Sequence, residues 1–232
     1  MLFGVREFFC LPLRALFSIK TLLKMEKEIR NISEEVRADA ESRKVDGYAL
    51  VFNSLSEDLG GFREQILPEA IDGVIERSDI YALLNHDESR GVLARSRKGK
   101  GSLTLEVDEH GLRYKFEAPK TSLGDEVLEY LRRGDISQSS FAFTVDTDEW
   151  EKQGDGSYIR TIKKFNRLYD VSPVFEPAYQ STSVKCARFA EVQEADRKAL
   201  EEAQKKAEEE AKAENEKIRS ELAEKYKDYM VK

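Results

Sequence analysis

One serine in the sequence has the surroundings that a nucleophile needs. Residues 134–145 read GDISQSSFAFTV, and the β-branched and aromatic residues after the glycine predict a strand. Period-2 alternation places Phe141 and Phe143 on one face and Ser140 on the other. The phenylalanines need a core, so Ser140 faces the opposite side, where small neighbours leave room for a substrate. Most serines in strands bind a backbone group or face solvent, so this pattern alone gives only a hypothesis.

A serine hydroxyl is a weak nucleophile at neutral pH and needs a base within hydrogen-bond reach. The chain contains only two histidines. His86 follows the apolar stretch at 80–84 and lies among polar residues, where an imidazole ring can face a cleft. His110 lies in a polar segment between two alternating stretches, which predicts a solvated turn. His86 is therefore the better candidate for the base, although the same spacing is also typical of a structural histidine.

Charge and cysteine content exclude some classes of function. The chain has 232 residues, enough for one domain with appendages, and a net charge of −7. That charge gives no electrostatic reason to expect a nucleic-acid partner. Cys10 and Cys186 lie far apart and outside any metal-binding spacing, so the sequence predicts neither a disulfide framework nor a metal site. We expect a reducing, cytoplasmic setting.

Residues 1–24 are apolar and basic, unlike the rest of the chain. Arg14 and Lys20 interrupt the apolar run, so no stretch reaches the roughly 18 apolar residues of a membrane span. A signal peptide and an amphipathic helix on a membrane surface are alternative interpretations. We favour a third, in which translation starts at Met25, because the residues that follow read like the start of a soluble protein.

Strands dominate the part of the chain that would position these residues. A helix is predicted to begin at Ser122, whose spacing to Asp125 fits a capping box, and to end at Gly134. The other predicted elements are strands at 45–53, 80–84 and 91–96, a short helix at 68–76, and a hairpin of 103–107 with 112–116.

A long hairpin should carry Ser140 on its first strand. Two extended strand patterns flank the turn signal Asp155-Gly156. With a two-residue turn, Val171 on the second strand would lie opposite Ser140. Asp170 would then lie close to Ser140 but point to the other face, unless a bulge in the hairpin reversed it.

Residues 191–232 have a different composition from the rest. Glu, Lys and Ala dominate this segment, and it contains neither proline nor glycine. This composition predicts a long, solvated helix. Its apolar positions are too sparse for a coiled-coil seam, so we expect it to be fully ordered only with a partner.

Four motifs, taken in order, resemble one protein family. They are GYALVFN, LLNHD, GDISQSSFAF and LYDVSPVFEPAY, and together they resemble the prohead (capsid maturation) proteases of tailed bacteriophages. That family is related in fold to assemblin, the maturation protease of herpesviruses. The resemblance covers about residues 45–188. It implies an α+β fold, namely a mainly antiparallel β-barrel core with flanking helices, to which the sequence adds the long C-terminal helix.

The resemblance also implies roles for individual residues. The histidine of the family falls on His86 within LLNHD, and its nucleophile falls on Ser140, directly before Phe-x-Phe. Where assemblin has a second histidine, the phage family has an acid, which falls best on Asp170 in LYDVSPV, with Asp87 and Glu176 as alternatives. The acid would hold the imidazole tautomer, and backbone N–H groups would form the oxyanion hole. The family needs no cofactor.

The implied function is that of a serine endopeptidase of phage head maturation. Such an enzyme cleaves scaffold, or the scaffold-like N-terminal part of the major capsid protein precursor, inside the prohead in the host cytoplasm, and then itself. Its partners would be that precursor or scaffold, the prohead shell and a further copy of the chain, with no membrane and no nucleic acid. Residues 25–190 would be the protease domain, 191–232 a charged helical tail and 1–24 an N-terminal extension.

A second interpretation keeps the fold and removes the catalysis. It is a capsid assembly or scaffolding protein that binds through the charged C-terminal helix. The presence of a serine, a histidine and an acid in matching places favours the enzyme.

Overall fold

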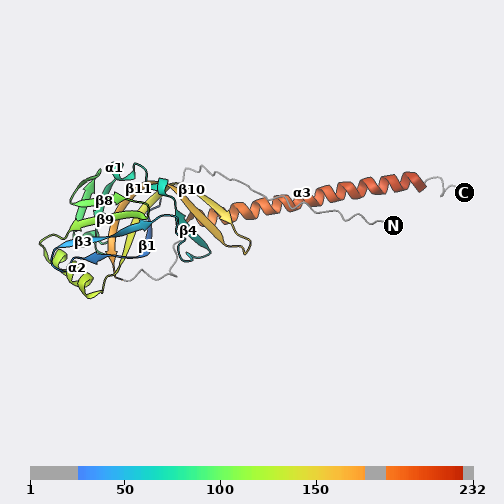
Figure 1. Cartoon of the computed structure of the whole chain (residues 1–232). Coiled ribbons are helices and arrows are strands. Elements are labelled where there is room, and N and C mark those ends of the chain that lie inside the picture. Colours follow the sequence, from blue (N-terminus) through green and yellow to red (C-terminus); the bar gives the residue numbers. More distant parts are fainter. Residues whose placement is uncertain (1–25, 176–186, 227–232) are drawn as a thin grey trace. The chain divides into compact units, whose positions relative to one another are not determined.

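The computed structural model describes residues 26–175 and 187–226. The chain divides into two compact units, Met1–Gln180 and Ser181–Lys232 (Figure 1). The first unit holds two β-sheets with short helices, and the second holds one long helix. The predicted extension at 1–24 lies outside the described residues, as do both cysteines, and the predicted boundaries at 24 and 190 stay predictions.

The larger sheet has seven strands and contains the long hairpin. Its strands lie in the order β1-β10-β11-β5-β6-β7, while β4 pairs with the first part of β11. β4 and β5 run parallel to β11, and the other neighbours are antiparallel. The bounds are β1 (Glu28–Glu35), β4 (Phe62–Ile66), β5 (Asp79–Ala82), β6 (Ala94–Arg97), β7 (Lys100–Gly101), β10 (Gln138–Lys152) and β11 (Tyr158–Val174).

The smaller sheet has four antiparallel strands in the order β2-β3-β9-β8. The predicted strand at 45–53 is β3, and the predicted hairpin of 103–107 with 112–116 is confirmed as β8 and β9. The bounds are β2 (Arg37–Ala38), β3 (Lys44–Val51), β8 (Leu103–Val107) and β9 (Gly111–Glu117).

The core combines buried side chains from both sheets. The rings of Phe141 and Phe143 on β10 lie 5.0 Å apart between centroids, and Phe143 lies 4.8 Å from Phe165 on β11. Tyr114 of β9 is fully buried in the same cluster. Burying one such side chain contributes roughly 1.5–3 kcal/mol. These rings therefore fix which face of β10 points inward, and Ser140 points the other way.

The strands form two open sheets instead of the closed barrel that the family resemblance implies. Within the described part of the chain no ladder joins the edges of the two sheets. The chain crosses between them at Val36 and again at Ser102, beside β2 and β7, which have two residues each and are too short to continue a ladder. Val36 is buried at its corner, where a Cβ on Gly47 would come within 3.0 Å of the Val36 Cβ. The fold is therefore mixed α+β, with many strands and a long C-terminal helix.

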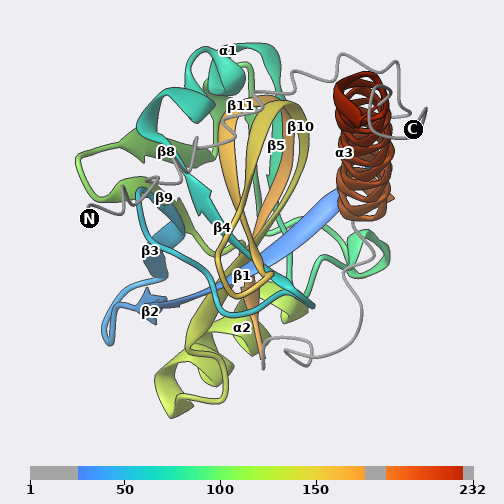
Figure 2. The same ribbon diagram turned by 90° about the vertical axis from the view of Figure 1, so that its right-hand side faces the viewer.

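The helix α2 (Ser122–Arg133) has a different N-cap from the predicted one. The Thr121 side chain accepts a hydrogen bond of 3.3 Å from the Gly124 N–H, and Asp125 forms an ion pair with an arginine instead of completing a capping box. Gly134 ends the helix at φ 79°, as predicted. The remaining short elements are the 3₁₀ turns η1 (Pro68–Ile71) and η2 (Glu88–Arg90) and the helix α1 (Val74–Arg77). In Figure 2, β10 and β11 run through the middle of this unit, with α1 at one end and α2 at the other.

The hairpin of β10 and β11 has a different turn and register from the predicted ones. The Gln153 N–H donates to the Ser157 carbonyl at 2.8 Å, which encloses a loop of three residues instead of two. Bulges along the hairpin then place Ser140 opposite Ser172. The register predicted from a two-residue turn is therefore wrong, and the alternative holds in which a bulge reverses the face: this one-residue change puts Asp170 on the same face as Ser140.

The second unit is the helix α3 (Ala187–Tyr226), which has 40 residues. The long helix predicted from residue 191 is confirmed over its described part. Its side chains are largely exposed, including Leu200, Ile218 and Leu222. Nowhere in the described ranges does a helix combine the length and apolar character needed to cross a bilayer.

Candidate active site

His86 lies between Ser140 and Asp170 and contacts both. Its Nδ1 is hydrogen-bonded to the Asp170 carboxylate, and its Nε2 lies 2.6 Å from the Ser140 hydroxyl oxygen. The three residues come from separate elements, because His86 follows β5 whereas Ser140 and Asp170 belong to β10 and β11. The fold thus brings together three residues that are distant in the sequence.

Strand register puts Ser140 and Asp170 on one face of the larger sheet. Ser140 pairs with Ser172 and Ala142 pairs with Asp170, and side chains two residues apart on a strand share a face. Phe141, between Ser140 and Ala142, is turned into the core and is 1% exposed. The alternation predicted for this strand is confirmed.

The backbone turns sharply at His86 and is held to the end of β11. Asn85 and His86 have φ of 53° and 58°, in the left-handed region that few residues other than glycine enter. The Asn85 N–H donates to the Pro173 carbonyl, and the Asn85 side-chain oxygen accepts from the Phe175 N–H, both at 3.1 Å. Sequence analysis did not single out Asn85, although asparagine adopts this conformation more readily than most residues.

Asp170 is 1% exposed and is surrounded by donors. The Ser172 hydroxyl donates to it at 2.7 Å, and the Lys27 ammonium lies 3.4 Å from its second oxygen. Burial, the largest single effect, would raise the pKa of Asp170. The hydrogen bond and charge of His86, the hydrogen bond of Ser172 and the charge of Lys27 together outweigh burial, so the pKa lies below its ordinary value. An ionised carboxylate accepts the proton of Nδ1 and leaves Nε2 free to accept the proton of Ser140.

Sequence analysis also missed Ser172 and Lys27. Ser172 could have been found, because it lies two residues after Asp170 on a strand and so shares its face. Lys27 precedes β1, a strand that no alternation of apolar residues predicts.

Ser139 and Ser140 point to opposite faces of β10. The Ser139 hydroxyl lies 2.8 Å from the Tyr114 hydroxyl, and both are buried on the core side. The Ser140 oxygen lies beside the imidazole and also 2.9 Å from the Arg30 carbonyl oxygen. Ser140, not Ser139, is therefore the serine within reach of a base.

The other candidates from the sequence are engaged elsewhere. The Asp87 carboxylate accepts from the Ser89 N–H at 2.9 Å and from its hydroxyl at 2.6 Å, which caps η2. His110 lies at the exposed tip of the β8–β9 hairpin, where its ring packs edge-on against Tyr48. Glu176 lies outside the described residues.

This arrangement can move a proton from a serine hydroxyl to an imidazole. The Ser140 proton can pass to Nε2 as the oxygen becomes nucleophilic, and Asp170 stabilises the imidazolium that forms. The same relay suits hydrolysis of esters and of peptides, so the geometry indicates acyl-transfer chemistry without naming a substrate. In residues 26–175 and 187–226, no group of three or more His, Cys, Asp and Glu side chains is arranged to hold a metal ion.

Comparison with known proteins supplies the class of chemistry. The sequence profile of a family described as Caudovirus prohead serine protease matches residues 28–198. Among solved structures, the capsid assembly protease of bacteriophage T4 is similar with 9% identity and a TM-score of 0.42 over 67% of this chain and 100% of that chain. That likeness is too weak to carry an argument, and no curated protein matches. The profile match covers most of the chain, which therefore belongs to the Caudovirus prohead serine protease family.

Proposed function

We propose that this protein is a serine endopeptidase in which Ser140 is the nucleophile, His86 the general base and Asp170 the acid that orients the imidazole. The observation that carries the proposal is the position of His86, with one ring nitrogen on a buried carboxylate and the other 2.6 Å from a serine hydroxyl. Membership of a protease family supports peptide bonds as the target.

The proposed reaction has two halves that use the same histidine. Nε2 of His86 takes the Ser140 proton while the serine oxygen attacks the scissile carbonyl carbon, and the imidazolium then gives that proton to the leaving amine. A water molecule loses its proton to the neutral imidazole and attacks the acyl-enzyme, and the returned proton restores Ser140. Backbone N–H groups are the expected donors to the oxyanion.

The proposed substrate is scaffold, or the scaffold-like N-terminal part of the major capsid protein precursor. The family description, which names the prohead, supports a place inside the assembling shell in the host cytoplasm. Self-cleavage would follow, and a self-associated form of the chain is part of the same proposal. The exposed helix α3 would serve as a docking element that concentrates the enzyme at the shell.

Purified protein incubated with its capsid precursor tests the proposal. Mass spectrometry should find one or a few defined cleavages with the wild-type chain and none with Ser140→Ala. Intact precursor with both proteins would reject the endopeptidase and favour a non-catalytic assembly protein. Equal cleavage by both proteins would reject Ser140 as the nucleophile.

A further inference from the structure

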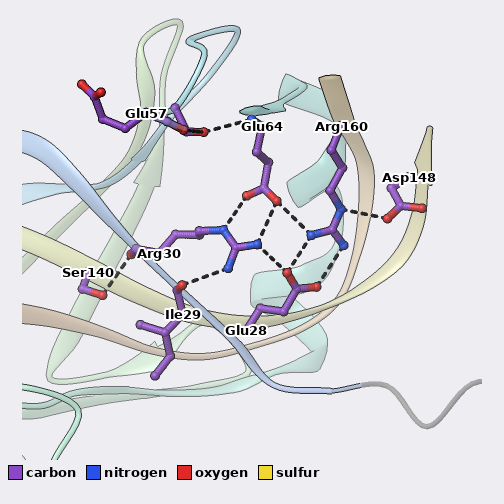
Figure 3. Close-up of polar contacts among 9 residues, drawn as sticks. Glu28, Ile29, Arg30, Glu57, Glu64, Ser140, Asp148 and Arg160 are labelled. Carbon is purple, nitrogen blue, oxygen red and sulfur yellow. Dashed lines mark hydrogen bonds and ion pairs between the residues drawn. The ribbon is translucent and has the colours of Figure 1, made fainter. Parts of the chain in front are cut away.

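A buried cluster of charged side chains lies next to the Ser140 end of the site. In Figure 3, the guanidinium groups of Arg30 and Arg160 lie between the carboxylates of Glu28, Glu64 and Asp148. The carboxylates come from β1, β4 and β10, and Arg160 comes from β11. Arg30 donates to both oxygens of Glu64 at 3.0 Å and to Glu28 at 2.6 Å. Arg160 donates to the same two glutamates and, through Nε, to Asp148 at 2.9 Å. We call Glu28, Arg30, Glu64 and Arg160 the β1 anchor, and Asp148 lies beside it in contact with Arg160.

The β1 anchor is largely buried. Arg160 is fully buried, and Glu64 and Arg30 are 3% and 6% exposed. Burial, the largest single effect, would raise the pKa of Glu28. The hydrogen bonds and charges of Arg160 and Arg30 together outweigh burial, so the pKa lies below its ordinary value. Replacing such a network by apolar residues often leaves stability unchanged or raises it, so stability alone does not explain a buried cluster of charges. The best-attested alternative role is to fix the register of one element against another.

The strand β1 needs side-chain contacts to fix its register because it is an edge strand of the larger sheet. It pairs with β10 on one side, and its register shifts between Ile32 and Glu35. Glu28 and Arg30 lie two residues apart, so both side chains point to the face that carries the β1 anchor. A slip of the strand would remove both from Glu64 and Arg160.

The N-terminal part of β1 and the residue before it contact both the proposed nucleophile and the proposed acid. The Arg30 carbonyl accepts a hydrogen bond of 2.9 Å from the Ser140 hydroxyl, and Figure 3 shows this contact beside the anchor. Lys27, directly before the strand, has its ammonium 3.4 Å from Asp170. The register of β1 therefore positions the carbonyl that contacts Ser140 and the ammonium that lies beside Asp170.

We propose that Glu28 and Arg30 are positioning residues that hold the Arg30 carbonyl against Ser140. This inference rests on the proposed function. The Ser140 hydroxyl has two acceptors, the Arg30 carbonyl oxygen and Nε2 of His86, and together they confine its oxygen to the place 2.6 Å from Nε2. The single hydroxyl proton can point to either acceptor, and rotation about the Cβ–Oγ bond moves it from the carbonyl to the imidazole.

The test compares substitutions of two β1 residues with a matched substitution of Asp148, which contacts Arg160 from β10. Glu28→Gln and Arg30→Lys weaken the grip of the anchor on β1. Asp148→Asn weakens a contact of the same Arg160 from β10, without touching β1. The probe is a fluorophosphonate, which reacts with activated serines, and its maximal inactivation rate and its half-saturating concentration are measured separately across pH. Circular dichroism and thermal melts select an assay temperature at which each variant is folded.

The proposal predicts that Glu28→Gln and Arg30→Lys lower the maximal inactivation rate by about 10- to 100-fold, the range expected for a misplaced reacting group. The half-saturating concentration should change by less than about twofold, and Asp148→Asn should keep the wild-type rate, because only the register of β1 matters. If Arg30→Lys does not fold, Glu28→Gln, which keeps the size of the side chain, carries the test.

Three results would overturn the positioning role. They are wild-type rates in both β1 variants, an equal loss in Asp148→Asn, and faster labelling in the β1 variants, which would make β1 a cover over Ser140. A wild-type chain that is never labelled on Ser140 would instead overturn the proposed function, and the positioning role with it.

Discussion

Asp170 pairs with Ala142 across the β10–β11 ladder, two residues from the position at which Ser172 pairs with Ser140. This offset puts the carboxylate and the hydroxyl on the same face and leaves room between them for one imidazole ring. The offset depends on a three-residue loop and on bulges in a long hairpin, so irregular pairing between Ser140 and the turn determines whether the three groups can meet.

Replacement of the two histidines should have opposite outcomes. His86→Ala removes the base beside Ser140, so cleavage of the capsid precursor should fall by several orders of magnitude. His110→Ala removes a ring at an exposed hairpin tip and should leave cleavage unchanged. Initial rates under identical conditions make the comparison, and an active His86→Ala protein would refute the mechanism.

Asp170→Asn should be far more damaging than Asp87→Asn. An amide at position 170 cannot hold the imidazole in the tautomer that accepts the serine proton, and this loss costs about 10⁴-fold in trypsin-type enzymes. Asp87→Asn removes only charge from a cap on η2. The kcat values of the two variants decide, and a larger loss in Asp87→Asn would transfer the role of the acid to Asp87.

Removal of the Lys27 charge should shift acid unfolding to higher pH. The pKa of Asp170 is lower in the folded chain than the ordinary value of about 3.9. Its contribution to stability is therefore present above that ordinary value and is lost as the pH falls through the lower folded-state pKa. Lys27→Met removes one of the causes of that lowering, so the folded-state pKa of Asp170 rises, its contribution to stability becomes smaller, and the loss is complete at a higher pH. Melting temperatures across acidic pH measure the shift.

The matched control for this change is Lys120→Met. Lys120 is an exposed lysine before α2, and its replacement removes the same charge without approaching Asp170. Coincident curves for both variants would show that Lys27 does not act on the carboxylate.

The left-handed turn at Asn85 gives a fourth prediction. Asn85→Ala must adopt φ 53° without the help of an asparagine side chain, which costs about 1–2 kcal/mol, and it loses the hydrogen bond to the Phe175 N–H. Asn85→Gly loses the same hydrogen bond but adopts the conformation freely. Chemical denaturation should therefore rank wild type above glycine and glycine above alanine. Equal stability of the alanine and glycine variants would contradict the conformational argument.

The face of the sheet to which Ser140 points could be predicted from the sequence, whereas the face to which Asp170 points could not. Phe141 and Phe143 must be buried, and this requirement alone turns Ser140, the residue before Phe141, to the opposite face. The orientation of Asp170 depends on loop length and bulges, which the turn signal Asp155-Gly156 does not specify. A single residue of error in the turn reverses the face.

The strand β1 could not be predicted from an apolar pattern, because the buried side chain in its described part, that of Arg30, is charged. Its sequence reads EIRNISEE, which lacks the apolar alternation of a half-buried strand. Arg30 is buried with its charge paired by Glu28 and by Glu64, and Glu64 is distant in the sequence. The prediction of a closed barrel was wrong for a related reason. The strands β2 and β7, where the chain passes between the sheets, have two residues each, which is too short for a recognisable alternation of apolar residues.

The central claim, that Ser140 is the activated nucleophile, is tested most directly by locating the adduct of a fluorophosphonate. Wild type, Ser140→Ala and Ser139→Ala are treated alike, and peptide mapping by mass spectrometry finds the modified residue. The account predicts one adduct per chain on Ser140, none in Ser140→Ala, and an adduct on Ser140 in Ser139→Ala, because Ser139 only hydrogen-bonds Tyr114 in the core. Undiminished labelling of Ser140→Ala, or an adduct that maps to Ser139 in the wild-type chain, would contradict it.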